Sequence, residues 1–188
     1  MKTIFTLMLV SLGLFAGPAN AALKPGDIAP LFSAQAALGG KDFDFSLAEA
    51  LKKGPVVLYF YPKSFTKGCT IEAHEFAESY DNFALAGASL IGVSYDPIDI
   101  QREFSTKECR DKFPVAADPN LSVISAYDAK RLKPSANGDT VADRISYVIL
   151  PDGKVGYALT DSNPSRHVEE TLAFVRKWRE LKKTETRN

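Results

Sequence analysis

Residues that support redox or metal chemistry are scarce in this chain of 188 residues. It holds two cysteines, Cys69 and Cys109, and two histidines, His74 and His167. The cysteines form no C-x-x-C pair, and neither histidine is spaced with a cysteine as zinc ligands are. The absence of these motifs argues against a zinc site and against a C-x-x-C dithiol site. Any cysteine chemistry therefore depends on the surroundings of each single thiol.

The sequence also has no excess of charge of either sign, because 23 Lys and Arg residues stand against 23 Asp and Glu residues. Nucleic acids and anionic membranes attract proteins chiefly through clustered basic residues. Beyond the N-terminal region, no apolar run is long enough to cross a bilayer. We therefore expect no nucleic-acid partner, and no membrane partner once the N-terminal segment has been removed.

The N-terminal segment has the parts of a secretory signal peptide. Lys2 gives a basic start, residues 4–15 are an apolar run, and residues 19–21 read A-x-A, as at a cleavage site. The run is too short to span a bilayer as a helix, although a retained membrane anchor is the alternative. We expect residues 1–21 to be removed and residues 22–188 to form one exported domain, in the bacterial periplasm.

The order of apolar runs and breaker residues predicts an α/β domain with a central mixed β-sheet and helices on both faces. The run 55–61 is continuously apolar, as is typical of a strand covered on both faces. Pro-Asp-Gly at 151–153 predicts a late antiparallel hairpin. Asp96 is expected to cap a helix that starts at Pro97. Further strands are expected at 32–38, 43–46, 88–94, 114–117, 145–150 and 155–159, and helices at 46–51, 66–85, 97–108, 121–127 and after 163.

Cys69 closes the stretch 62–69, which joins the buried strand to an amphipathic helix. With Thr66 as the N-cap, Cys69 is the third helical residue, among backbone N–H groups that have no carbonyl partner. A free thiol has a pKa near ~8.5 and is about 3% thiolate at pH 7, but helix N-termini and nearby cations favour the thiolate. The sequence thus predicts a reactive cysteine, with the Thr66 hydroxyl hydrogen-bonded to the sulfur or to an oxygen attached to it.

Arg144 is a candidate for the nearby cation because it stands at the start of the predicted strand 145–150. A permanent cation that enters a core strand costs free energy unless it is paired. Glu72 and the Cys69 thiolate are its expected partners, although a glutamate in the first turns is favourable in any helix. Pro62 ends the buried strand and, lacking an N–H group, is expected to shield the thiolate without competing for it.

The pattern Pro62-x-x-x-Thr66-x-x-Cys69, with Glu72 three residues further on, resembles the peroxidatic signature of the peroxiredoxins. The later segment that begins at Arg144 resembles the strand that carries the arginine of their active site. The spacing is most similar to the bacterioferritin comigratory protein (peroxiredoxin Q) group of the alkyl hydroperoxide reductase C and thiol-specific antioxidant superfamily. The similarity extends over nearly the whole expected mature chain, and it implies a thioredoxin-like fold.

The same resemblance implies a thiol-dependent peroxidase that reduces hydrogen peroxide and organic hydroperoxides. Cys69 would be the peroxidatic cysteine and become a sulfenic acid. Thr66 and Arg144 would position the peroxide, and Pro62 would shield the thiolate. No metal ion or organic cofactor is needed for this reaction. A thioredoxin-like thiol reductant is the expected electron donor, and a monomer or weak dimer is the expected assembly.

The resolving thiol is where this chain departs from the group that it resembles. Many members carry a second cysteine five residues after the first, where this sequence has His74. Cys109 is the only other thiol, and it follows the predicted helix 97–108. Two interpretations stay open: Cys109 condenses with the Cys69 sulfenic acid, or an external thiol resolves a one-cysteine enzyme.

Two other functional classes compete with the peroxidase. An exported thiol–disulfide oxidoreductase would normally use C-x-x-C, but Glu72 stands where the second cysteine would be. A non-catalytic thioredoxin-like module would hold a structural disulfide between Cys69 and Cys109. That module would leave Thr66 and Arg144 without a purpose, so the peroxidase is the favoured hypothesis.

Overall fold

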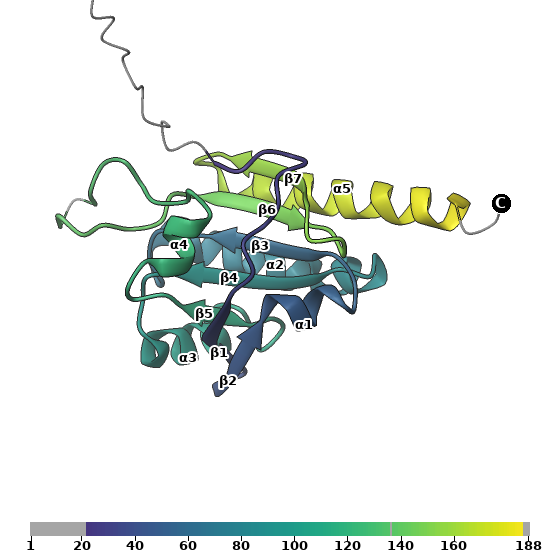
Figure 1. Cartoon of the computed structure of the whole chain (residues 1–188). Helices are drawn as coiled ribbons and strands as arrows, with labels where there is room; N and C mark the ends of the chain where they lie inside the picture. Colours follow the sequence, from purple (N-terminus) through teal and green to yellow (C-terminus); the bar gives the residue numbers. More distant parts are fainter. Residues whose placement is uncertain (1–21, 136, 186–188) are drawn as a thin grey trace, which may run out of the picture.

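The computed structural model describes residues 22–135 and 137–185 (Figure 1). The predicted signal peptide, residues 1–21, lies outside the described residues. The strands are β1 Ser33–Leu38, β2 Lys41–Ser46, β3 Val56–Phe60, β4 Ser89–Ser94, β5 Val115–Ala117, β6 Ile145–Ile149 and β7 Val155–Thr160. The helices are α1 Leu47–Leu51, α2 Lys67–Leu85, α3 Ile98–Lys107, α4 Ser122–Ala126 and α5 Pro164–Glu185.

The strands form one seven-stranded sheet in the order β2-β1-β5-β4-β3-β6-β7. Strand β3 lies between β4, to which it is parallel, and β6, to which it is antiparallel. All five residues of β3 are buried, as its unbroken apolar sequence predicts. The late hairpin is present as the antiparallel pair β6 and β7. The predicted mixed sheet is therefore confirmed.

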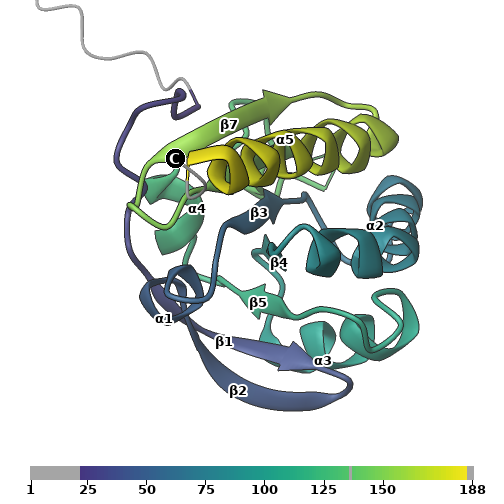
Figure 2. The ribbon, with the colours of Figure 1, turned by 90° about the vertical axis from the view of Figure 1, so that its right-hand side faces the viewer.

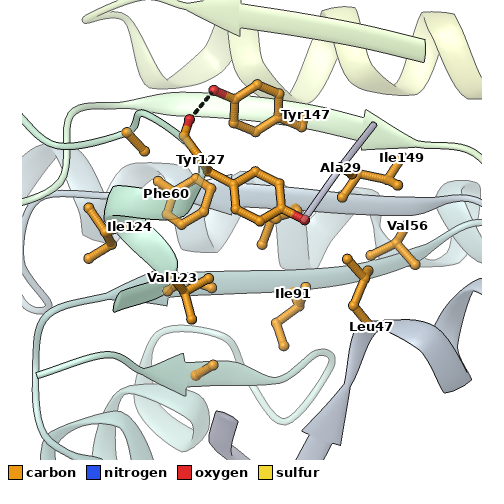
Figure 3. Packing of buried hydrophobic residues seen from close by; sticks show 14 of the residues in the cluster. Ala29, Leu47, Val56, Phe60, Ile91, Val123, Ile124, Tyr127, Tyr147 and Ile149 are labelled. Carbon is orange, nitrogen blue, oxygen red and sulfur yellow. Dashed lines mark hydrogen bonds between the residues drawn. The ribbon is translucent and has the colours of Figure 1, made fainter. Parts of the chain in front are cut away.

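Helices cover both faces of the sheet, as predicted (Figure 2). On one face, α1 and α4 pack on a cluster that includes Leu47, Phe60 and Tyr127. Figure 3 shows this cluster, with the Tyr147 hydroxyl donating a hydrogen bond to the carbonyl oxygen of Tyr127 at 2.9 Å. On the other face, α2, α3 and α5 pack on a second cluster, and both cysteines belong to it. Within the described residues, no helix has the length and apolarity needed to cross a membrane.

Asp96 does not cap α3, and that prediction is wrong. Helix α3 starts one residue later than expected, with Pro97 at the N-cap position and no side-chain cap. The Asp96 carboxylate instead accepts hydrogen bonds from the backbone N–H of Ser64 and the hydroxyl of Ser94, both at 2.7 Å. A buried carboxylate needs hydrogen-bond donors, and these two supply them in place of the helix N-terminus.

Candidate active site

Cys69 occupies the place in the fold that the sequence predicts. Strand β3 ends at Phe60, a short loop follows, and α2 begins with Thr66 at its N-cap position. Cys69 is the third residue of α2, and its side chain is 2% exposed. The first backbone N–H groups of a helix have no partner within it, so their positive ends stabilise negative charge on a nearby atom. The thiol thus lies where the backbone favours a thiolate.

Arg144 joins Cys69 to Glu72 across the start of α2. One guanidinium nitrogen, Nη2, lies 3.5 Å from the Cys69 sulfur, and the other, Nη1, donates to Glu72 Oε2. The glutamate is completely buried, and the Arg144 side chain is nearly so. Gly68 makes this approach possible, because a Cβ atom there would stand 3.0 Å from Arg144 Nη2. The structure therefore brings together the three residues that the sequence pairs.

Burial and the interaction between the two side chains determine the pKa values of Glu72 and Arg144. Burial raises the pKa of Glu72 to about 8, although the Arg144 guanidinium opposes the shift. Burial works against the charge of Arg144, but its interactions with Glu72 and Cys69 outweigh burial and raise the Arg144 pKa. Arg144 therefore stays cationic at all physiological pH values. The second oxygen of Glu72, Oε1, has no hydrogen-bond partner among the residues that the structure describes.

Thr66 differs from its predicted role in one respect. Its hydroxyl donates to the carbonyl oxygen of Lys63 at 2.9 Å, and it makes no hydrogen bond to Cys69. The loop turns sharply here because Phe65 has a φ of 60°, and this turn brings the Lys63 carbonyl under the hydroxyl. The donor of Thr66 is thus occupied, and its oxygen is left as an acceptor.

Pro62 and Thr66 both line a hollow of about 350 Å³. The opposite wall comes from the loop between α4 and β6 and includes Arg131 and Asp139. Cys69 is not among the residues that line this hollow. Pro62 is half-buried, and its role in shielding the thiolate stays a prediction.

A buried polar network holds the loop that precedes Cys69, and the sequence alone did not indicate it. Asp96 fixes the Ser64 backbone, and the Tyr61 hydroxyl donates to Gln101 Oε1 at 2.7 Å. Gln101 in turn donates to the Ser94 hydroxyl at 2.7 Å. The partners come from β4, α3 and the loop, far apart in sequence. The one available signal was Gln101, a polar residue on the buried side of its helix.

Comparison with known proteins identifies the family. The model of the AhpC/TSA family matches residues 25–158. The chain belongs to the AhpC/TSA family. Peroxiredoxin Bcp of Escherichia coli strain K12 is 31% identical over 156 residues, which cover 82% of this chain and 96% of that protein. The chloroplastic peroxiredoxin Q of Triticum aestivum is 35% identical over 125 residues, covering 66% of this chain but only 55% of the wheat protein's length.

Solved peroxiredoxin structures share the fold. The crystal structure of the peroxidoxin BcpB from Mycobacterium tuberculosis has a TM-score of 0.73 and 30% identity, covering 82% of this chain and 97% of that one. Peroxiredoxin Q of Xanthomonas campestris has a TM-score of 0.68 and 27% identity, covering 77% and 90%. The predicted thioredoxin-like peroxiredoxin fold and the Bcp and peroxiredoxin Q resemblance are confirmed. As a peroxiredoxin, the chain is a thiol peroxidase, an oxidoreductase.

The second thiol of this peroxiredoxin is enclosed. Cys109 directly follows the C-cap of α3 and is completely buried, and both cysteines are free thiols. Burial, with smaller contributions from Glu108 and Asp111, raises the Cys109 pKa well above its ordinary value. The disulfide between Cys69 and Cys109 is therefore not present in this structure, and Cys109 is a protonated thiol here.

The turn around Cys109 combines strain with ion pairs. Arg110 and Asp111 both adopt positive φ values, 51° and 58°, and this conformation costs a residue such as arginine about 1–2 kcal/mol, although aspartate tolerates it better. His74, five residues after Cys69, contacts Glu108 Oε2 through Nε2 at 2.6 Å. This contact ties α2 to the residue before Cys109.

Over residues 22–135 and 137–185, no group of three or more His, Cys, Asp or Glu residues could hold a metal ion.

Proposed function

We propose that this peroxiredoxin reduces hydrogen peroxide and organic hydroperoxides at Cys69. The observation that carries the proposal is the 3.5 Å contact between Arg144 Nη2 and the Cys69 sulfur at the start of α2. A fixed cation and unpaired backbone donors beside one sulfur favour the thiolate, which is the reactive form. They also favour a negative charge that develops on a neighbouring oxygen.

In the proposed reaction, the Cys69 thiolate attacks the distal oxygen of the hydroperoxide. A sulfur–oxygen bond forms and the oxygen–oxygen bond breaks, so the sulfur is oxidised to a sulfenic acid. Hydroxide or alkoxide leaves and takes up a proton to become water or an alcohol. Arg144 stabilises the charge as it spreads over the two oxygens. Thr66, whose hydroxyl proton is given to Lys63, accepts the hydrogen bond of the hydroperoxide O–H group.

We further propose that Cys109 resolves the sulfenic acid. Its thiol displaces the sulfenic oxygen as water and forms a disulfide with Cys69. Both sulfurs are buried, so the turn at 108–112 has to open first. The strain at Arg110 and Asp111 supports this step, because opening the turn releases it. Glu72 keeps Arg144 in place during the first step, by accepting its Nη1 hydrogen bond.

Thiol counting after one equivalent of hydrogen peroxide tests both steps. We expect the reduced wild type to lose both of its thiols and about 2 Da of mass, because a disulfide forms. The Cys109→Ser variant should lose its single thiol and gain about 16 Da as a sulfenic acid. If the wild type keeps the Cys109 thiol, an external thiol is the resolver. If no thiol is lost in either protein, the peroxidase proposal is wrong.

The cellular setting is also a proposal. The signal-peptide pattern in residues 1–21 supports export, and the bacterial occurrence of Bcp relatives supports the periplasm. An exported enzyme is separated from cytosolic thioredoxin, so a periplasmic thioredoxin-like protein is the proposed reductant. The proposed assembly is a monomer or weak dimer.

A further inference from the structure

His167 is a buried histidine that the motif around Cys69 does not include. It lies in the first turns of α5 and is completely buried, yet both ring nitrogens have partners. Nδ1 lies 2.8 Å from the hydroxyl of Ser146, and Nε2 lies 2.9 Å from the carbonyl oxygen of Asp161. An imidazole in the core with both nitrogens hydrogen-bonded has a fixed orientation, and it can therefore fix the position of the residues to which it is bonded.

The partners fix the protonation state of the ring. A carbonyl oxygen can only accept, so Nε2 of His167 carries a hydrogen and donates it to Asp161. Burial lowers the His167 pKa, and the charge of Arg144 lowers it further against the opposing effect of the Asp161 carbonyl. The ring is therefore neutral, Nδ1 is bare, and the Ser146 hydroxyl donates to it.

Both partners of the ring are attached to the segment that carries Arg144. Ser146 lies in β6, two residues after Arg144, which directly precedes the strand. The backbone N–H of Asp161 donates to the carbonyl oxygen of Arg144 at 3.4 Å. The imidazole thus reaches the segment of Arg144 in two ways: through the Ser146 side chain, and through Asp161, whose carbonyl oxygen accepts from the ring and whose backbone N–H donates to Arg144.

We propose that His167 is a positioning residue for Arg144 and that it keeps the guanidinium at its distance from the Cys69 sulfur. This inference rests on the proposed peroxidase function. His167 touches neither the sulfur nor the peroxide, and it acts only through Ser146 and Asp161. A neutral ring suits this place, because a second cation would repel the guanidinium that it positions.

Two reactions of Cys69 separate positioning from general structural support. The rate of alkylation by iodoacetamide reports the accessible thiolate at Cys69. This reaction involves no peroxide, so it does not depend on stabilising charge on a peroxide oxygen. Oxidation by hydrogen peroxide needs both the thiolate and a correctly placed Arg144. We expect His167→Phe, which fills the space but removes both hydrogen bonds, to slow oxidation by about 10-fold. Alkylation should slow by a smaller factor, because the backbone donors at the start of α2 stay in place.

Conservative variants and a matched control complete the test. His167→Gln places an amide N–H near the position of Nε2 and should restore most of the oxidation rate through Asp161. Val175→Ala removes packing from an equally buried position on α5. It should leave the ratio of the oxidation rate to the alkylation rate unchanged. If His167→Phe fails to fold, Ser146→Ala removes one of the two connections and should lower the same ratio.

Each outcome has a distinct meaning. Equal slowing of both reactions in His167→Phe, or an unchanged oxidation rate, would overturn the positioning role and leave a structural histidine. Measuring the wild-type protein in the same series distinguishes a failure of the positioning role from a failure of the proposed peroxidase function. If wild-type Cys69 alkylates but does not react with peroxide, the peroxidase proposal fails; if it reacts and His167→Phe reacts equally fast, only this inference fails.

Discussion

Cys69→Ser should lower the rate of hydroperoxide reduction by at least about 10,000-fold, because the variant lacks the nucleophile that accepts the oxygen. A serine hydroxyl is not ionised beside Arg144 at neutral pH, and its oxygen cannot be oxidised as sulfur can. The substitution is nearly isosteric and should leave the fold intact. Stopped-flow mixing of reduced protein with hydrogen peroxide measures this rate directly.

The second cysteine gives the matched control for this substitution. Cys109→Ser changes the same atom at a position that is just as deeply buried. It should complete one round of oxidation at close to the wild-type rate and then stop, because the resolving step is missing. Peroxide reduction by Cys69→Ser at the wild-type rate would move the chemistry to another residue.

Arg144→Met should slow the oxidation of Cys69 by about 100- to 1,000-fold, which is the usual effect of removing one preorganised donor from a developing negative charge. Methionine keeps much of the side-chain length but removes both nitrogen contacts, to Cys69 and to Glu72. Without the cation, burial should hold Glu72 in its neutral form, so the variant is not left with a buried charge. Arg144→Lys should be intermediate, because one ammonium group cannot reproduce the two-nitrogen contact.

A surface arginine is the control for the loss of a positive charge. Arg102 pairs with Asp42 at 2.6 Å in an exposed ion pair. Arg102→Met should leave the oxidation rate unchanged and have little effect on stability, because solvent screens an exposed ion pair. If Arg144→Met and Arg102→Met both react as fast as wild type, Arg144 takes no part in stabilising the transition state.

The central group of the site could be predicted from simple rules. A buried strand, an N-cap residue and a helix place Cys69 at a helix N-terminus. The rule that buried charges are paired assigns Arg144 to Glu72 across 72 residues of sequence. Each inference needed one strong local pattern and one energetic requirement, and the sequence contains both.

The details that sequence analysis missed depend on contacts between distant segments. Thr66 had several possible acceptors, and the turn at Phe65 made the Lys63 carbonyl the nearest one. Asp96 precedes a helix and has a high capping propensity, but the donors of Ser64 and Ser94 attract the same carboxylate. A local preference of about 1 kcal/mol is easily outweighed by the requirement to satisfy a buried charge.

His167 shows the same limit most clearly. One of its partners, Ser146, becomes a neighbour only when α5 packs beside β6, whereas the Asp161 carbonyl lies six residues before it in sequence. Spacing within the sequence relates the histidine to neither cysteine, so a search for metal or catalytic motifs passes over it.

The most direct test of the central claim is to locate the transferred oxygen. Reduced Cys109→Ser protein is treated with one equivalent of hydrogen peroxide, digested and analysed by peptide mass. The only methionines are Met1 and Met8, so oxidation of methionine cannot affect the peptide that contains Cys69. We predict an added mass of about 16 Da on that peptide and on no other. Consumption of the peroxide with an unmodified Cys69 peptide would contradict the proposed reaction.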